Sequence, residues 1–325
     1  MEKNNMINKT PSLEAIKKNV GKVLVVMGGS SAEREISIRS GEAVHKSLCN
    51  YQLQSFLFNW SGKDLDFLRN IDFDTCFIIV HGRGGEDGKL QAALDIWGKP
   101  FTGSGFTASA IAMHKFRTKQ IWEWCGLRTP RSLLWSENLR VNSVLEELSL
   151  PLMIKPAHEG SSVGISLVDK RDDILIAIDK AKKYDKEILV EEYIEGTEYT
   201  VSIVDNHPLP SIKLQTPRQF YDFDAKYLSN DTEYICPSGL TIEEEKLIST
   251  LGMKAFEAIG CTGWGRVDFI RNKNGEFFLI EVNTVPGMTD HSLVPMAAKQ
   301  QGILFDELVL RILCSSIKGY EHEFC

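Results

Sequence analysis

The sequence has no apolar run near the roughly 20 residues that a membrane span needs, and it has no long run of basic residues. Its formal net charge of −7 argues against a nucleic-acid backbone as the main partner. The seven cysteines form no C-x-x-C pair, and an odd number suits a reducing compartment better than a disulfide framework. Residues 1–19 are polar and lack the apolar core of a signal peptide, and we expect them to form a loose extension or a short helix. We therefore expect a soluble, cytoplasmic protein that binds neither membranes nor nucleic acids.

Two common nucleotide-binding motifs are also missing. Gly88 and Lys89 come nearest to a Walker A motif, but Arg83 stands where its first glycine should be and Leu90 where Ser or Thr should follow. Residues 100–108 match G-x-G-x-x-A, yet no suitable acidic residue follows about 20 positions later at the end of a second strand. A nicotinamide-dependent dehydrogenase is therefore a weak alternative.

The chain does contain the pattern of an α/β unit at its N-terminal end. A β-branched run at residues 23–27 leads into two glycines and then a segment with helical spacing, which is typical of a buried parallel strand followed by a helix. A second apolar strand, residues 75–80, leads into the glycine-dense loop 81–88 and a helix at 90–97. Glu33 lies in the first turn, where it could serve a ligand site or simply cap the helix. We expect a ligand site at this edge of the sheet.

The middle of the chain predicts a second domain with a phosphate loop. A helix from about residue 109 to 125 ends at Gly126. A short strand then ends at Lys155, and a Gly/Ser loop follows up to Gly164 before the next strand. Backbone amides in such a loop can cradle phosphate oxygens, and Lys155 would add a positive charge. An ordinary hairpin with a surface lysine is the alternative.

Acidic residues lie near the end of the next strand, residues 188–194, and in the turn after it. Glu191, Glu192 and Glu198 could accept hydrogen bonds from an adenine amine and ribose hydroxyls, or they could be solvated charges at a sheet edge. Residues 208–239 have little periodicity, which is typical of a lid over a site, and Lys226 and Tyr227 are its candidate ligand contacts. Helices are expected at 242–259, with Thr241 as its N-cap, and at 303–317.

The C-terminal part predicts a hairpin with an unusual polar face. Two apolar runs, 266–270 and 277–283, flank Asn274 and Gly275, a strong signal for a two-residue turn. This register places Asp268 opposite Glu281. It also places Arg266 opposite Asn283, on the same face.

The opposite face of this hairpin is expected to join the core through Val267, Phe269, Ile280 and Val282. Directly opposed carboxylates repel each other unless a positive group lies between them. Two carboxylates and an amide oxygen suit Mg²⁺ or Mn²⁺, and Mg²⁺ with few protein ligands usually also binds substrate phosphates. The alternative is a solvated face on which Arg266 neutralises the acids.

Several motifs in order resemble those of the D-alanine–D-alanine ligase family of ATP-grasp enzymes. They are GGSSAEREIS, HGRGGEDGKLQ, IKPAHEGSSVG, EEYIEGTEYTV, DAKYLSNDT, GWGRVDFI and EVNTVPGMTDHSLVPMAA, and they span residues 22–317. The resemblance implies an α/β (α+β) ATP-grasp fold. A flexible extension (1–20) would precede a parallel-sheet substrate-binding domain (21–105), and two α+β domains (106–194 and 195–325) would clasp ATP. It also implies a homodimer that uses Mg²⁺ or Mn²⁺.

The resemblance assigns roles to individual positions. Asp268, Glu281 and Asn283 resemble metal ligands. The positions that resemble ATP contacts are the phosphate-binding Lys115 and Lys155 and the adenine or ribose contacts Glu191, Glu192, Ile194 and Glu198. The positions that resemble catalytic residues are Glu33, Ser161, Tyr227, Arg266 and Gly287, the last through its backbone amide. The positions that resemble contacts of the two D-alanine substrates are His81, Lys226, Ser292 and Leu293.

In that family ATP phosphorylates the carboxylate of one D-alanine, and the amine of a second attacks the acyl phosphate. Two positions depart from the common pattern: His158 stands where arginine is frequent and Val285 where serine is frequent. Neither is a presumed ligand. The alternatives are a related ligase that uses D-lactate or D-serine as second substrate, and a nucleotide-binding protein without catalysis.

Overall fold

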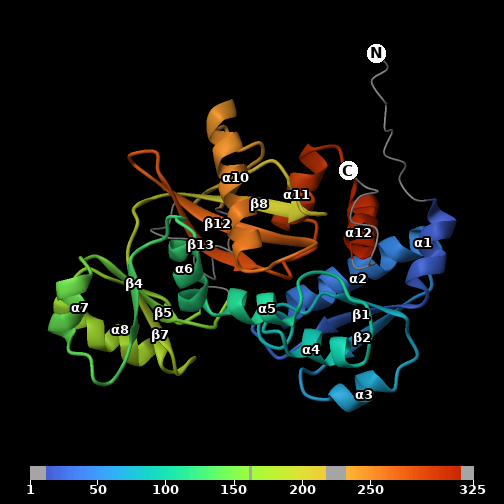
Figure 1. The fold of residues 1–325 in the computed structure, drawn as a ribbon, viewed down its shortest axis with the longest axis horizontal. Helices are drawn as coiled ribbons and strands as arrows, with labels where there is room; N and C mark the ends of the chain where they lie inside the picture. Colours follow the sequence, from blue (N-terminus) through green and yellow to red (C-terminus); the bar gives the residue numbers. More distant parts are fainter. Residues whose placement is uncertain (1–11, 161–162, 217–231, 316–325) are drawn as a thin grey trace.

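The computed structural model describes residues 12–160, 163–216 and 232–315. Three sheets lie in a row in it: a parallel sheet near both termini, a large antiparallel sheet in the middle and a small antiparallel sheet at the far end (Figure 1). In these three ranges, no helix is both long and apolar enough to cross a membrane. The mixture of parallel and antiparallel sheets confirms the expected α/β (α+β) class.

The parallel sheet has the strand order β2-β1-β3. Its strands are β1 (Val23–Gly28), β2 (Ser55–Trp60) and β3 (Thr75–Ile78), and the first is buried along its whole length, as its continuous apolar run predicts. The helices of this region are α2 (Arg34–Asn50), α3 (Leu65–Arg69) and α4 (Lys89–Ile96). Strand, glycine turn and helix therefore follow one another as predicted.

Part of the expected N-terminal extension is a packed helix. Helix α1 (Leu13–Val20) begins at Ser12, whose hydroxyl accepts a hydrogen bond from the backbone of Ala15. Ile16 and Val20 are buried in the core of the parallel sheet. Of the two expectations for this stretch, a loose extension or a short helix, the short helix is the one found at residues 13–20, because a single apolar stripe suffices to dock it.

The small sheet has the order β4-β7-β5-β6 and is antiparallel throughout. Its strands are β4 (Ser132–Trp135), β5 (Leu152–Pro156), β6 (Ser166–Val168) and β7 (Ile188–Glu192). Helix α7 (Val141–Glu147), the 3₁₀ turn η1 (Arg171–Asp173) and helix α8 (Ile174–Ala181) complete it. Val144, Ile154 and Ile178 belong to a separate core beneath this sheet.

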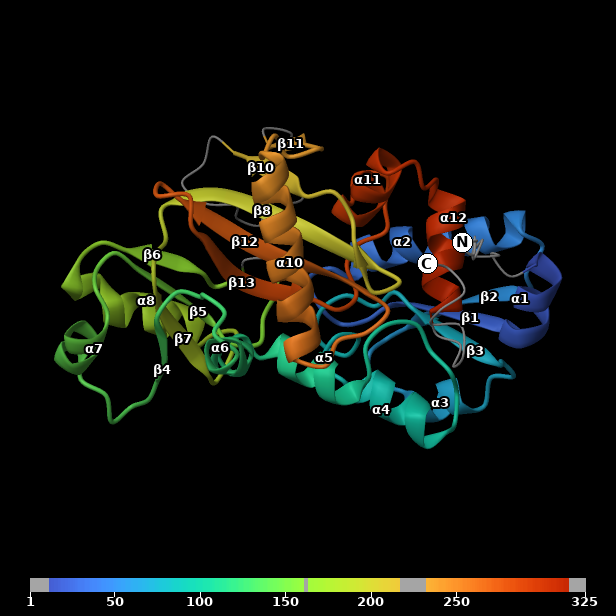
Figure 2. The ribbon, with the colours of Figure 1, turned by 45° about the horizontal axis from the view of Figure 1, so that its top comes forward.

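The large sheet has the order β11-β10-β8-β12-β13, and β9 pairs with β8. Its strands are β8 (Gly196–Val204), β9 (His207–Pro208), β10 (Ile212–Gln215), β11 (Glu233–Ile235), β12 (Trp264–Asn272) and β13 (Phe277–Asn283). Helix α10 (Ile242–Ala258) lies across it (Figure 2). Thr241 caps this helix in a capping box with Glu244, which confirms the predicted N-cap.

Other helices join the sheets to one another. The helix expected from about residue 109 to 125 is two helices, α5 (Phe106–Met113) and α6 (Lys115–Trp124), which meet at His114. Their Trp122 is packed in one core with Phe256 of α10. Helices α11 (Leu293–Gln300) and α12 (Phe305–Cys314) contribute instead to the core of the parallel sheet. Residues from different predicted domains thus share the same hydrophobic cores. The domain boundaries themselves remain a prediction.

The hairpin β12–β13 has the predicted register at its polar end. Arg266 pairs with Asn283 and Asp268 with Glu281. The loop, however, has three residues, since the backbone of Asn272 pairs with that of Glu276 at 2.9 Å, so the expected two-residue turn is wrong. A bulge after Asp268 shifts the register back by one residue. The two deviations cancel each other.

The bulge also changes which side chain enters the core. Leu279, not Ile280, is buried beside Val267 and Phe269. Ile280 instead lines the cavity between the two antiparallel sheets. The expected core position of Ile280 is therefore wrong, because the extra residue turns its side chain to the other face.

Candidate active site

A cavity of about 300 Å³ lies between the small and the large antiparallel sheets. Its apolar lining includes Met153, Ile165 and Phe269, and polar residues surround them, a combination that is typical of small-molecule sites. The residues predicted from the sequence that line it are Lys115, Lys155, Glu191, Glu192, Ile194, Glu198, Arg266, Asp268, Glu281 and Leu293. The fold therefore brings most of the predicted nucleotide and metal positions into one place.

Asp268 is the centre of the polar hairpin face. Arg266 donates from Nε and Nη2 to its two carboxylate oxygens, each at 2.8 Å. The amide nitrogen of Asn283 donates to Oδ2 at 2.9 Å, and the hydroxyl of Thr200 on β8 donates to Oδ1 at 2.7 Å. Arg266 thus balances the charge of Asp268. This agrees with the alternative expectation from the sequence, in which Arg266 neutralises the acids of this face. Thr200 was missed in the sequence because only the β8–β12 register brings it opposite Asp268.

Glu281 is balanced by a lysine from another element. Lys115, the first residue of α6, lies with Nζ 3.1 Å from Glu281 Oε2. The same ammonium donates to the backbone oxygen of Glu159 at 2.7 Å, and the backbone amide of Lys115 donates to Ala157 at 3.0 Å. Helix α6 is therefore attached to the loop after β5, which is the predicted phosphate loop.

A second group of buried charges supports the other side of the cavity. Glu191 on β7 lies 2.5 Å from the ammonium of Lys155 on β5 and 3.1 Å from that of Lys119 on α6. Burial opposes the ionisation of Glu191, but the two lysines outweigh it and lower its pKa. Burial lowers the pKa of Lys119 to about 8. No role for Lys119 was predicted, although its spacing of four residues from Lys115 places both on one face of α6.

His81 and Glu86 join the glycine loop 81–88 to the loop after β13. His81 is buried, and its Nδ1 lies 2.7 Å from the backbone oxygen of Val285. Glu86 accepts hydrogen bonds from the amides of Val285 at 2.9 Å and Gly82 at 2.7 Å. Burial, and then the charge of Glu33, raises the pKa of Glu86 to about 7, while burial lowers the pKa of His81. Glu86 was missed because the sequence does not show this loop contact.

Glu33 stands at the start of α2 but does not cap it, since its side chain makes no cap hydrogen bond. The capping alternative is therefore wrong. A Cβ added to Gly82 or to Gly160 would lie 3.2 Å from the Glu33 carboxylate. The glycine loop and the phosphate loop therefore both approach this side chain through a glycine, which has no Cβ atom and so allows a close contact.

Gly287 and Ser292 lie together beyond the hairpin. A Cβ on Gly287 would lie only 2.8 Å from the Ser292 hydroxyl, so a side chain there has no room. Ser292 immediately precedes α11, and its hydroxyl accepts a hydrogen bond from the amide of Thr289 at 2.9 Å. The predicted Ser161, Lys226 and Tyr227 lie outside the described residues.

Residues 120–314 match the family model described as the D-ala D-ala ligase C-terminus. The chain is 49% identical over 300 residues to the D-alanine–D-alanine ligase of Chromohalobacter salexigens, which covers 92% of this chain and 96% of that one. It is 50% identical over 297 residues to that of Alkalilimnicola ehrlichii, with 91% and 95% covered. The chain belongs to the D-alanine–D-alanine ligase family.

Solved structures of the family have the same fold. The D-alanine–D-alanine ligase of Bacillus anthracis complexed with ATP superimposes with a TM-score of 0.81 at 29% identity, covering 91% of this chain and 97% of that chain. The VanG D-Ala:D-Ser ligase of Enterococcus faecalis has a TM-score of 0.80 at 26% identity, with 91% and 99% covered. The ATP-grasp fold expected for a family member is thereby confirmed.

Proposed function

We propose that the cavity between the two antiparallel sheets joins two molecules of D-alanine into D-alanyl-D-alanine, while ATP is converted to ADP and phosphate. The observation that carries this proposal is the convergence of Lys115, Lys155, Arg266, Asp268 and Glu281 around one cavity in a chain of this ligase family. The dipeptide is a building block for peptidoglycan. The enzyme is an ATP-dependent carboxylate–amine ligase.

The reaction proceeds by activation of a carboxylate. A carboxylate is a poor electrophile, and transfer of the γ-phosphoryl group gives D-alanyl phosphate, which the amine of the second D-alanine attacks to release phosphate. Lys115 and Lys155 bind the phosphates, and each now lies against a carboxylate, Glu281 or Glu191, that holds it in place. Arg266 and the amide of Gly287 stabilise the oxygen on which negative charge develops. Catalysis then rests mainly on positioning and electrostatics.

The donor groups of the hairpin fit a hard divalent cation. Asp268 and Glu281 are cross-strand neighbours, and Asn283 adds an amide oxygen next to them. An all-oxygen set of this kind suits Mg²⁺ or Mn²⁺. A bound cation supplies positive charge that neutralises the transferred phosphoryl group. Arg266 and Lys115, which now balance the two acids, become available for the substrate and the phosphates.

The nucleotide base and ribose bind where β7 meets β8. Glu191, Glu192, Ile194 and Glu198 all line the cavity there, and the apolar side chains of Met153 and Phe269 also line it. Glu192 has a structural partner as well, since its carboxylate accepts a hydrogen bond from the amide of Ser149 at 3.1 Å. Glu191 has structural partners too, the ammonium groups of Lys155 and Lys119.

The amino acids bind at the carboxyl ends of the parallel strands. Glu33, with the glycine and phosphate loops on either side, binds the amino group of the first D-alanine, and His81 contacts the same molecule. The resemblance to the family adds a link from Glu33 to Ser161 and Tyr227, two positions outside the described residues. Ser292, Leu293 and Lys226 bind the second D-alanine.

Two broader expectations accompany this function. All six described cysteines are free, which is compatible with a reducing cytoplasm. We also expect a homodimer, which light scattering of the purified protein would test. A monomer mass near 37 kDa would contradict it.

The direct test of the proposal is ADP release from ATP in the presence of D-alanine alone, D-alanine with D-lactate, and D-alanine with D-serine. We expect release with D-alanine alone and a dipeptide product. If D-alanine alone gave no ADP while D-lactate or D-serine restored release, the second substrate would be different. If no combination released ADP although ATP bound, the chain would be a nucleotide-binding protein without ligase activity.

A further inference from the structure

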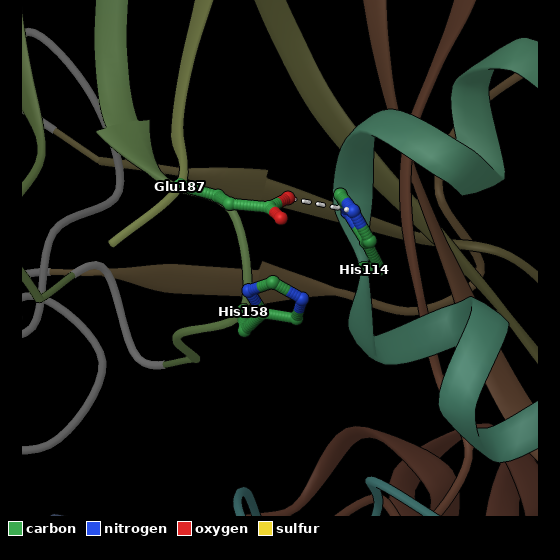
Figure 3. Close-up of side chains that lie close together, drawn as sticks. All are labelled: His114, His158 and Glu187. Atoms are coloured by element: carbon green, nitrogen blue, oxygen red, sulfur yellow. Dashed lines mark ion pairs between the residues drawn. The ribbon is translucent and has the colours of Figure 1, made fainter. Parts of the chain in front are cut away.

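Three side chains outside the nucleotide cavity converge on one point (Figure 3). His114 lies between α5 and α6, His158 in the loop after β5 and Glu187 just before β7. One ligand atom of each lies within 4.8 Å of the others. The Nε2 of His114 is 3.0 Å from Glu187 Oε2, and the two imidazole rings are 4.4 Å apart between centroids. No role in the proposed reaction uses these three groups.

A carboxylate behind the cluster orients one of the rings. Asp185 Oδ2 lies 2.8 Å from His158 Nδ1 and also accepts a hydrogen bond from the backbone amide of His158 at 2.8 Å. This contact places a proton on Nδ1 and leaves the lone pair of Nε2 available. Carboxylate–histidine pairs of this kind support the metal-binding histidines of proteins.

The donor set suits a transition ion better than Mg²⁺. Two imidazoles and one carboxylate are typical ligands of Zn²⁺, which binds three protein groups and leaves a position for water. Zn²⁺ bonds of about 2.0–2.1 Å place tetrahedral ligand atoms roughly 3.4 Å apart. No pair of ligand atoms therefore has to close by more than roughly 1.4 Å. The side chains of His114, His158 and Glu187 are 14%, 31% and 48% exposed, so an ion can reach them.

The contacts of His114 leave a place for the proton that a metal ion displaces. The carboxylate of Glu187 can only accept a hydrogen bond, so in this structure Nε2 of His114 carries a proton. A metal ion would replace that proton at Nε2, and the ring would then carry its proton on Nδ1, which has no hydrogen-bond partner among the described residues.

We propose that His114, His158 and Glu187 form a binding site for Zn²⁺ or a similar transition ion, separate from the oxygen donors of the hairpin, and that its occupation slows turnover. His114 immediately precedes Lys115, whose amide and ammonium already bond to residues 157 and 159. An ion between His114 and His158 cross-links the same joint. It fixes the start of that loop, residues 157–159, against α6, so the Lys115 ammonium between them no longer adjusts when nucleotide enters and leaves.

The binding half of this proposal is tested without substrates. Metal-free protein is titrated with Zn²⁺ in competition with a chromogenic chelator, and with Co²⁺ while its visible absorption is recorded. We expect one ion per chain and a four-coordinate Co²⁺ spectrum, with affinity at least ten-fold weaker in His158→Gln and in Glu187→Gln. His207→Gln is the matched control, because His207 lies on β9 outside the cluster. Equal affinity in all variants overturns the site.

His45 provides a further internal check. It lies 3.8 Å from the sulfur of Cys49 and could hold a soft metal on its own. If His45→Gln loses the ion while His158→Gln retains it, the proposed site is wrong. Thermal melting of each metal-free variant shows whether it is folded. If His158→Gln does not fold, Glu187→Gln tests the site at a more exposed position.

The regulatory half rests on the proposed ligase function and is tested by activity. At saturating Mg²⁺, ATP and D-alanine, Zn²⁺ at a concentration that fills the cluster should lower kcat several-fold in the wild-type chain. Each variant is compared with its own metal-free rate, and His158→Gln should lose this inhibition. Zn²⁺ that displaces Mg²⁺ from the hairpin would inhibit both proteins alike and would overturn the regulatory half. A failure of the ligase assay leaves the binding test intact, so the two hypotheses fail separately.

Discussion

Replacing Lys119 by methionine tests the buried charge network that supports the nucleotide cavity. Lys119 is 1% exposed, lies 3.1 Å from Glu191 and donates to the hydroxyl of Thr129 at 2.7 Å. Loss of one member of a buried ion pair costs about 3–5 kcal/mol, because the remaining charge loses its compensation. Glu191 keeps Lys155 at 2.5 Å, and the substitution also removes the cost of burying the Lys119 charge, which lowers the pKa of that group. We therefore expect a smaller loss, about 1–2 kcal/mol. This corresponds to a fall in Tm of roughly 2–8 °C for a unit of about 200 residues.

Differential scanning calorimetry of Lys119→Met measures this change, with Arg117→Met as the control. Arg117 lies two residues away on α6, is exposed and donates a hydrogen bond to Gln120 within the same helix, so its loss should cost less than about 0.5 kcal/mol. A fall in Tm for Lys119→Met no larger than that for Arg117→Met would refute the reasoning. The network would then contribute nothing to the stability of the cavity.

The pH dependence gives a second check on Lys119. Its pKa is about 8 in the folded chain and 10.5 as the ordinary value. Between these values the unfolded chain binds more protons, so the stability of the wild type rises with pH. The difference between the wild type and Lys119→Met should therefore widen by about 3 kcal/mol from pH 8 to 10.5. A difference that stays constant over this range would contradict a strongly lowered pKa.

Two further predictions concern the loops around the substrates. Glu86 has a pKa of about 7 when folded against an ordinary 4.5, so the stability of the wild type relative to Glu86→Gln should fall by about 3 kcal/mol as pH rises through this window. Urea unfolding at pH 4.5, 6 and 8 measures the difference, and parallel curves would contradict it. Gly287→Ala should displace the Ser292 hydroxyl, which lies 2.8 Å from the added Cβ, and raise KM for the second D-alanine about ten-fold. Gly105→Ala, where an added Cβ meets no atom within 4 Å, should leave KM unchanged, and equal effects of both changes would contradict the contact.

Local patterns in the sequence predict much of the fold because they reflect local physics. The continuous apolar run of β1 predicts a parallel strand, and Thr241 with Glu244 predicts the start of α10. The polar end of the hairpin has the expected register as well, but through two deviations that cancel. Neither the third loop residue nor the bulge at Ile280 follows from an Asn-Gly signal, because both depend on how β12 packs between β8 and β13.

The parts of the site that the sequence does not predict come from segments distant in the chain. Thr200 contacts Asp268 across 68 positions, and Glu86 contacts Val285 across 199. Such contacts have no local pattern, so only the folded chain shows them. The break at His114 was missed for the same reason: the apolar spacing continues through it, while the contact of Lys115 with the phosphate loop fixes where α6 begins.

Glu281→Gln tests the central claim that the hairpin face carries the chemistry. The change removes one charge and keeps the volume, and Glu276→Gln at the other end of the same hairpin is the control. With saturating ATP, Mg²⁺ and D-alanine, kcat of Glu281→Gln should fall about a thousand-fold, since stabilisation of the phosphoryl charge is worth several kcal/mol. Its Tm should fall by no more than a few degrees, since Lys115 keeps its hydrogen bond to the backbone oxygen of Glu159. A kcat within a few-fold of the wild-type value would contradict the claim.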